Sequence, residues 1–308
     1  MEVILQLFIL IFGFLLLVKG ADFFVDGSSK IAKKFGISEL IIGLTIVAMG
    51  TSAPETAVSI AAALKGTADI SIGNVVGSNI LNILIILGIS ATIRTIKVGK
   101  TTIKYEIPFM IAISALLLLL GLDGTIDFKD GIILWLLFIA YLAYLIIMAK
   151  KDKQKEEKKF KVILWQVILA TLGGLALIIV GSDISVDAAS KIARYAGLSE
   201  RFIGLTIVAL GTSLPELITS VTAAFKGNND IAIGNIVGSN IFNILFVIGT
   251  SSLILPITFA STFKIDSLVM IGAALLLFIC SLRKQKLDRF SGILMLLSYA
   301  LYFILVLI

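Results

Sequence analysis

The 308-residue sequence contains no histidine, a single cysteine (Cys280) and only four prolines. Without histidine, His-ligated zinc or haem sites and Ser-His-Asp catalysis are excluded. A single cysteine cannot form an internal disulfide bond. Charged residues are also scarce: they make up 15% of the chain, against about 25% in soluble globular proteins.

Hydrophobic residues, in contrast, make up 58% of the chain, and a soluble fold has no place to bury so many apolar side chains. The composition therefore excludes a soluble enzyme, a disordered scaffold and a secreted disulfide protein. Apolar runs of about 20 residues mark membrane-spanning helices. The first run is not a cleavable signal peptide, because Glu2 rather than a basic cluster follows Met1. We predict an all-α membrane protein with ten transmembrane helices at 3–23, 40–63, 70–92, 105–122, 130–149, 162–182, 201–224, 231–256, 265–282 and 289–308.

The basic residues indicate how these helices cross the bilayer. If both termini lie outside, the inner loops hold 19 Lys and Arg residues and the outer loops hold six. Seven of the 19 are lysines of the segment 150–161, a polar linker between two groups of five helices. Because cytoplasmic loops are enriched in Lys and Arg, we predict a cell-membrane protein with a cytoplasmic linker and both termini outside. The net charge of +6 is then a topology signal and requires no nucleic-acid partner.

The two groups of helices are copies of each other at an offset of 161 residues. Aligning 19–83 with 180–244 gives 40 identities in 65 positions, which indicates a duplicated unit. The units are 1–149 and 162–308, and each has five predicted spans. Because five is an odd number, the second copy enters the membrane the opposite way. Inverted repeats are a known transporter architecture, with the substrate site near the bilayer midplane.

The first repeated motif is GTSAPE at 50–55 and GTSLPE at 211–216. Its proline removes a backbone donor and clashes with the preceding turn, so we predict a helix broken near its centre in each copy. The carbonyl groups freed by the break are costly in lipid unless they line a cavity or meet a ligand. The hydroxyl side chains of the motif stand three and four residues before the glutamate and share a helix face with it.

The glutamates of this motif, Glu55 and Glu216, indicate the class of function. Nearly all other acidic residues can be placed at span ends or in loops, but these two lie deep in apolar runs. A charge at that depth costs about 2.5–3.5 kcal/mol on insertion scales, and no Lys or Arg in the same core can pair with it. The two carboxylates repel each other unless protons or cations lie between them.

The second repeated motif is a polar stripe at spacing i, i+4, i+8, beside GxxxG pairs that are typical of close helix packing. We expect its serines and last asparagines to bind a ligand or form a gate. Asn79 and Asn240 lie on another face, and we expect a structural role for them. The stripe consists of Asn74, Ser78 and Asn82 in the first copy and Asn235, Ser239 and Asn243 in the second.

A site built only from oxygen atoms favours hard cations. Calcium takes 6–8 oxygen ligands, of which Glu55 and Glu216 offer four, and backbone carbonyl groups near Thr51 and Thr212 would bring the number to about six. Two carboxylates also balance one divalent charge. Sodium could use the same groups, whereas magnesium is less suited because it retains its waters.

At these residues the sequence resembles the cation/calcium antiporter superfamily, whose two α-repeats carry similar GTSxPE and GNxxGSNxxN segments. The resemblance covers nearly the whole chain. It implies four clustered ion sites, one for calcium and the rest for sodium, electrogenic exchange of three Na⁺ for one Ca²⁺, and first and sixth spans that slide to alternate access. By this resemblance the central ligands would be Glu55 and Glu216, joined by Thr51, Ser52, Thr212, Ser213 and the carbonyl groups of Ala48 and Ala209, with Ser78 and Ser239 at outlying sodium sites and Asn82 and Asn243 beside the centre.

One position departs from that pattern. Many exchangers that this sequence resembles carry Asp where this chain has Asn243.

Three alternative functions remain. A calcium/proton antiporter would use the same two glutamates, but the neighbouring hydroxyl groups favour sodium. A cation channel does not need an inverted repeat with broken helices, and an intramembrane enzyme lacks a nucleophile–base pair. We expect a membrane transporter that is not an enzyme and that functions as a monomer.

Overall fold

The computed structural model describes residues 2–153, 163–197, 209–282 and 284–307. The described residues form an all-helical protein in which seven helices are long and apolar enough to cross a membrane, or eight if a bent pair counts as one span. The linker residues 154–161 and the first part of the seventh predicted span, 201–208, lie outside the described residues. The tenth predicted span forms α16 (Arg289–Leu307), whose apolar stretch is shorter than that of the others.

The helices of the first half are α1 (Glu2–Phe35), α2 (Glu39–Ile42), α3 (Ala48–Thr51), α4 (Ala53–Leu64), α5 (Asp69–Leu81), α6 (Gly88–Ile93), α7 (Ile107–Leu120) and α8 (Phe128–Lys153), joined by π-helical segments η1 (Gly43–Val47), η2 (Asn82–Leu87) and η3 (Thr102–Glu106) and the 3₁₀ turn η4 (Gly121–Asp123). Those of the second half are α9 (Leu164–Tyr195), α11 (Ala209–Thr212), α12 (Leu214–Lys226), α13 (Asn229–Phe242), the π-helical η6 (Asn243–Ile248), α14 (Gly249–Ile254), α15 (Ser261–Leu282) and α16.

The predicted first and sixth spans end too early. The prediction placed their ends at residues 23 and 182, where the apolar runs stop, but α1 continues to Phe35 and α9 to Tyr195. Polar side chains do not end a helix; the chain leaves these helices near Gly36 and Gly197, which adopt positive φ angles of 63° and 79°. At a rise of about 1.5 Å per residue α1 is about 51 Å long, so it must tilt to fit a bilayer core of about 30 Å.

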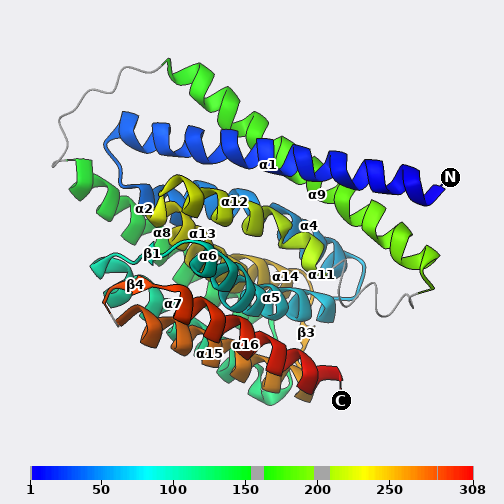
Figure 1. Ribbon diagram of the computed structural model, residues 1–308. Coiled ribbons are helices and arrows are strands. Elements are labelled where there is room, and N and C mark those ends of the chain that lie inside the picture. The colour runs from blue at the N-terminus through cyan, green and yellow to red at the C-terminus, as the bar shows by residue number, and fades with distance from the viewer. Residues whose placement is uncertain (1, 154–162, 198–208, 283, 308) are drawn as a thin grey trace.

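Helices α1 and α9 lie side by side across one face of the remaining bundle (Figure 1). Glycines allow their backbones to approach closely. A Cβ atom placed on Gly20 would lie 2.7 Å from the carbonyl oxygen of Gly174, and one on Gly181 would lie 2.8 Å from that of Gly13. Small residues at such a crossing are typical of helix pairs in membranes.

The centre of the bundle is formed by two equivalent helical runs. The run from α5 to α6 is 72% buried over its most apolar stretch, and the run from α13 to α14 is 94% buried. Both carry the polar stripe predicted from the sequence. Their burial means that their asparagine and serine side chains must find partners inside the protein or bind a ligand.

Two short antiparallel pairings tie loops of the two halves together. Strand β1 (Ile96–Lys97) pairs with β4 (Lys286–Leu287), and β2 (Thr125–Ile126) pairs with β3 (Ile257–Thr258). Strand β3 is the equivalent of β1 in the second copy, and β4 is the equivalent of β2, at the same offset of 161 residues. Each pairing is therefore the counterpart of the other. In Figure 1 β1 and β4 lie at one end of the bundle and β3 at the opposite end.

Candidate ion-binding site

Each repeated GTSxPE motif breaks a helix, as the sequence predicts. In the first copy α3 ends at Thr51, Ser52 leaves the helical conformation (φ −80°, ψ 12°) and α4 begins at Ala53, with a bend of 49° between the two parts of the span. In the second copy Ser213 (φ −90°, ψ 4°) separates α11 from α12. The proline stands in the first turn of the following helix, where a missing N–H group costs little.

The breaks bring the two glutamates into a crossed arrangement. The Ser52 hydroxyl donates to Glu216 Oε1 at 2.8 Å, and the Ser213 hydroxyl donates to Glu55 Oε1 at 3.2 Å. Both glutamates are fully buried. Each motif thus supplies one carboxylate and also the hydroxyl group that binds the carboxylate of the other motif.

The second oxygen of each carboxylate has no partner. Glu55 Oε2 and Glu216 Oε2 are buried and accept no hydrogen bond, and neither residue forms a salt bridge within the described part of the chain. Leaving a buried polar atom unpaired costs about 1–3 kcal/mol, and more for a charged group. A cation bound between the helices would offset this free-energy cost, because it would pair with both oxygen atoms.

Two asparagines fix the backbone beneath the carboxylates. Asn74 Nδ2 donates to Ser59 Oγ at 3.0 Å and to the Glu55 carbonyl oxygen at 3.2 Å. Asn235 Nδ2 makes the equivalent bonds to Ser220 Oγ at 2.9 Å and to the Glu216 carbonyl oxygen at 3.5 Å. The first residue of each polar stripe therefore holds the glutamate-bearing helix in place.

The last asparagines of the stripes also present free oxygen atoms. Asn82 Nδ2 donates to Asn240 Oδ1 at 2.9 Å, and Asn243 Nδ2 donates to Asn79 Oδ1 at 3.2 Å. Because the amide nitrogens are engaged, the oxygens Asn82 Oδ1 and Asn243 Oδ1 point elsewhere, and both are buried without a partner. A π-helical segment begins at each of these asparagines, a local geometry that is frequent at functional sites.

Asn79 and Asn240 have the structural role expected from the sequence. Each donates its amide N–H to the main-chain carbonyl oxygen of the other, at 3.2 Å in both cases. These reciprocal bonds lock α5 against α13. They also turn the Asn79 side-chain oxygen toward Asn243 and the Asn240 side-chain oxygen toward Asn82.

The remaining predicted residues surround the same centre with less symmetry. Thr51 is buried, and its hydroxyl lies 3.0 Å from Asn235 Oδ1 and 3.3 Å from the Ala48 carbonyl oxygen. Ser239 donates to that same carbonyl oxygen at 3.4 Å. Ser78 is buried on α5, Thr212 is half-buried at the end of α11, and Ala209 is the first residue of α11.

A cavity of about 640 Å³ borders the two helix breaks on one side. It lies between α9 and α4, and its lining includes Pro54 of the first motif and Gly211 and Thr212 of the second. On the opposite side α1 packs along α12. These two helix pairs occupy equivalent positions in the two copies, so the structure is open at one of them and closed at the other.

The donor set of the centre is entirely oxygen. Within the described residues no three His, Cys, Asp or Glu side chains form a metal-binding group. A cation here would be bound by two carboxylates with amide, hydroxyl and carbonyl oxygens. Such ligands suit calcium or sodium and disfavour soft metals.

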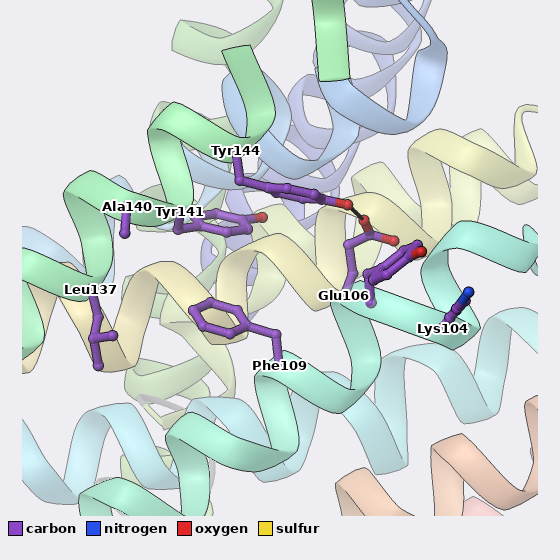
Figure 2. A pocket seen from close by; sticks show the side chains of 8 residues that line it. Lys104, Glu106, Phe109, Leu137, Ala140, Tyr141 and Tyr144 are labelled. Atoms are coloured by element: carbon purple, nitrogen blue, oxygen red, sulfur yellow. Dashed lines mark hydrogen bonds between the residues drawn. The ribbon is translucent and has the colours of Figure 1, made fainter. Parts of the chain in front are cut away.

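One buried acidic residue escaped the sequence prediction. Glu106 stands near the beginning of a span and was counted among the span-end residues, but its side chain is only 1% exposed. Its predicted span begins at residue 105, so the sequence alone gives no signal of its burial. It lines a separate cavity with Tyr144, which donates to it (Figure 2).

Comparisons with known proteins identify the family of the chain. The sodium/calcium exchanger protein family matches residues 5–147 and 166–308. The sodium/calcium exchanger MaX1 of Methanosarcina acetivorans is 32% identical, with 96% of this chain and 97% of that protein covered. The inner membrane protein YrbG of Escherichia coli is 39% identical, with 93% and 92% covered.

Solved structures of the sodium-calcium exchanger NCX_Mj are similar over nearly the whole chain. One, soaked with zero Na⁺ and Ca²⁺, superposes with a TM-score of 0.85, and another, soaked with Na⁺ and Sr²⁺, with a TM-score of 0.86. Both are 35% identical in sequence, and the match covers 97% of this chain and 98% of that chain.

Proposed function

This multi-pass membrane protein belongs to the sodium/calcium exchanger family, and on that premise we propose that it exchanges sodium for calcium across the membrane by alternating access. The transported ions are Na⁺ and Ca²⁺, with three sodium ions moved for each calcium ion. The chain works as a secondary transporter and as a monomer. Its membrane is the cell membrane, with both termini outside and the linker 150–161 in the cytoplasm.

One observation carries this proposal. Four buried oxygen atoms of the two repeated motifs and the two polar stripes, two from carboxylates and two from amides, lack hydrogen-bond partners. All four are acceptors, so a bound hydrogen-bond donor or a cation would satisfy them, and two carboxylates match the charge of one calcium ion. We assign Glu55 and Glu216 as its central ligands.

The other predicted residues complete the proposed sites. Asn82 and Asn243 contribute their free amide oxygens next to the centre. The hydroxyl groups and carbonyl oxygens around the two breaks serve sodium, which needs more oxygen ligands than a proton does. These groups belong to Thr51, Ser52, Ser78, Thr212, Ser213 and Ser239 and to the backbone of Ala48 and Ala209.

We further propose ten membrane spans in two inverted repeats of five. The reciprocal hydrogen bonds support this arrangement, because the bonds of the serine–glutamate pairs, of Asn74 and Asn235 to their serines, and of the four central asparagines each have a counterpart 161 residues away. The strand pairings β1–β4 and β2–β3 have the same relation. A two-fold axis in the membrane plane would produce this pattern.

The difference between the two sides of the site supports alternating access. The cavity beside α9 lies next to Arg194 and Asp187, which the charge distribution places toward the outside. On the other side Lys226 of α12 binds two aspartates of α1, Asp22 at 3.2 Å and Asp26 at 2.8 Å. We assign the structure to an outward-open state in which α1 closes the cytoplasmic path.

The test is calcium uptake by the purified protein in liposomes. We expect uptake when sodium is loaded inside and diluted outside, and none when both sides hold equal sodium. An imposed pH gradient without a sodium gradient is the control. Uptake driven by the pH gradient alone would assign the protein as a calcium/proton antiporter, and uptake that needs neither gradient would indicate a channel.

A further inference from the structure

A second cavity, of about 340 Å³, lies between the beginning of α7 and the helix α8, and no residue of the ion site lines it. Its walls are largely aromatic. The ring of Phe109 stacks on that of Tyr141 at a centroid distance of 5.6 Å, and Tyr141 stacks on Tyr144 at 6.5 Å. Figure 2 shows these rings and the Glu106 carboxylate around the same space.

Two polar atoms of this cavity lack partners. Glu106 Oε1 accepts a hydrogen bond from the Tyr144 hydroxyl, but Glu106 Oε2 is buried and accepts none. The hydroxyl of Tyr141, a residue only 4% exposed, is also buried without a partner. A carboxylate oxygen beside aromatic ring faces suits an ammonium group, which donates hydrogen bonds and is attracted by the rings.

The duplication separates this cavity from ion exchange. Glu55 and Glu216 are identical in the two copies, whereas the position equivalent to Glu106 is Ser267. A transport function shared by both halves therefore does not require the Glu106 carboxylate. Its burial, which is costly in a membrane protein, points to a role of its own.

The position of the cavity indicates what kind of ammonium compound reaches it. Glu106 is four residues from the beginning of its span and Tyr144 seven residues from the end of its own, so both lie about 6–10 Å from the span ends. This is the depth of lipid headgroups and the first acyl carbons. Exposed apolar residues of α8, including Leu136 and Ile139, face outward beside it.

We propose that this cavity binds the headgroup of an aminophospholipid of the phosphatidylethanolamine type. The ammonium group of the lipid donates to Glu106 Oε2 and to the Tyr141 hydroxyl. Lys104, an exposed residue whose Nζ lies 5.2 Å from the Tyr105 ring centre, binds the phosphate. The acyl chains run along the apolar outer face of α8.

The test measures lipid binding to the purified full chain, so it is independent of transport. Phosphatidylethanolamine, phosphatidylcholine and phosphatidylglycerol with identical acyl chains are added in detergent, and bound lipid is counted by native mass spectrometry. We expect one phosphatidylethanolamine to bind at least about tenfold more tightly than the other two lipids, since a choline headgroup has no N–H to donate. Equal binding of the ethanolamine and choline lipids would overturn the proposal.

Variants locate the site. Glu106→Gln should lower the affinity for phosphatidylethanolamine about tenfold or more. The matched control is Asp266→Asn, which alters the carboxylate that accepts from Tyr302 at 2.9 Å in the second half and should leave binding unchanged. If Glu106→Gln fails to fold, Tyr141→Phe removes only the unpartnered hydroxyl and should weaken binding about three- to tenfold. An unchanged affinity in the variant that folds would overturn the assignment.

A soluble amine separates a lipid from a free ammonium compound. Octylamine carries the ammonium group and a chain but no phosphate. We expect it to bind more weakly than phosphatidylethanolamine, and we expect Lys104→Met to weaken the lipid but not the amine. If octylamine binds as tightly as the lipid, the cavity is a site for simple amines and the phospholipid assignment is wrong.

Discussion

At the scale of single residues, each of the two carboxylates accepts a hydrogen bond from a serine of the other copy of the motif. Ser52 binds Glu216 and Ser213 binds Glu55, so neither glutamate can move toward a cation independently of the other. Their free oxygens, Glu55 Oε2 and Glu216 Oε2, are left for an ion. A divalent ion with only one carboxylate would keep an unbalanced charge in a site of low dielectric constant.

Neutralising either glutamate should therefore abolish calcium binding. We expect Glu55→Gln or Glu216→Gln to cost about 3–5 kcal/mol, the usual effect of removing one partner of a buried charge pair, which corresponds to a loss of affinity of more than about hundredfold. Isothermal titration with calcium in detergent measures it. Glu39→Gln, at a carboxylate that binds Ser29 outside the site, is the control and should retain native affinity. Near-native affinity in either site variant would remove that residue from the site.

The surroundings of Asn243 favour an amide over a carboxylate at this position. Its Nδ2 donates to Asn79 Oδ1, and Asn79 cannot turn over because its own Nδ2 donates to the Asn240 carbonyl oxygen. A carboxylate at position 243 would place an oxygen against the Asn79 oxygen unless it carried a proton. The amide keeps one free oxygen for a cation and adds no charge.

Replacing Asn243 by aspartate should have a small effect. We expect Asn243→Asp to change calcium affinity at neutral pH by about tenfold or less, or about 1.4 kcal/mol, because two carboxylates already balance the divalent charge. Calcium titration at a fixed sodium concentration measures the change. A much larger gain in affinity would show that the site needs a third charged ligand.

Residue patterns predicted the site better where both copies carry the same residue. The two motifs and the two polar stripes contain the hydrogen-bonded serines and glutamates and the last asparagines, and the same repeated segments carry Asn79 and Asn240 on another face. Glu106 was missed because position along an apolar run indicates depth in the membrane but not what packs against a side chain. Its burial depends on Tyr144, 38 residues away, which no local pattern reveals.

At the scale of helices, the sequence predicted where spans break but not where they end. Proline and the repeated motif identify the breaks at Ser52 and Ser213, because proline acts on the backbone locally. The ends of α1 and α9 depend instead on how these helices continue beyond the apolar core. Asp22 and Asp26 lie within α1, where Lys226 of α12 binds both of them.

The other copy has the same three residue types, but the equivalent salt bridges are not formed among the described residues. The residues equivalent to Lys226, Asp22 and Asp26 are Lys65, Asp183 and Asp187. Within the described residues Lys65 forms no salt bridge, and Asp187 binds Lys191 of its own helix at 2.6 Å. If α1 and α9 slide together, as the family resemblance implies, the Lys226 contacts break on one side while Lys65 meets the aspartates on the other.

Removing Lys226 should therefore favour the opposite state. Salt bridges near a surface contribute about 0–1 kcal/mol, so we expect Lys226→Met to lower the ratio of outward-open to inward-open protein by up to about fivefold. The measurement is the labelling rate, by a membrane-impermeant maleimide, of a cysteine introduced at Val58 in the outer cavity, in a Cys280→Ser background. Lys65→Met is the matched control and should leave labelling unchanged or raise it. Faster labelling in Lys226→Met would contradict the proposed role of these salt bridges.

At the scale of the whole molecule, two nearly identical motifs occupy different surroundings. The cavity beside α9 reaches Thr212, while Thr51, its equivalent, is buried and bonded to Asn235. A duplicated sequence cannot say which copy faces the open side, because each half can take either position. The family was predictable from the repeats, and the match to the sodium/calcium exchanger family confirms it, whereas the proposed outward-open state is inferred from the packing of α1 and α9.

The proposed sharing of the two carboxylates also predicts how sodium and calcium act on each other. Glu55 and Glu216 are linked through Ser52 and Ser213, so an ion that draws one carboxylate toward itself changes the position of the other. Sodium and calcium cannot both use these oxygens, because the two carboxylates neutralise only one divalent ion or two monovalent ions. Occupancy by one ion should therefore exclude the other.

We accordingly expect the apparent affinity for calcium to fall as sodium rises. Calcium uptake by proteoliposomes is titrated at increasing external sodium, with potassium replacing sodium so that ionic strength stays constant. Because several sodium ions displace one calcium ion, the calcium concentration needed for half-maximal uptake should rise more steeply than in proportion to sodium, while the maximal rate at saturating calcium stays the same. A calcium affinity that does not change with sodium would mean separate sites or coupling to protons, and a falling maximal rate at unchanged affinity would mean that sodium acts away from the two glutamates.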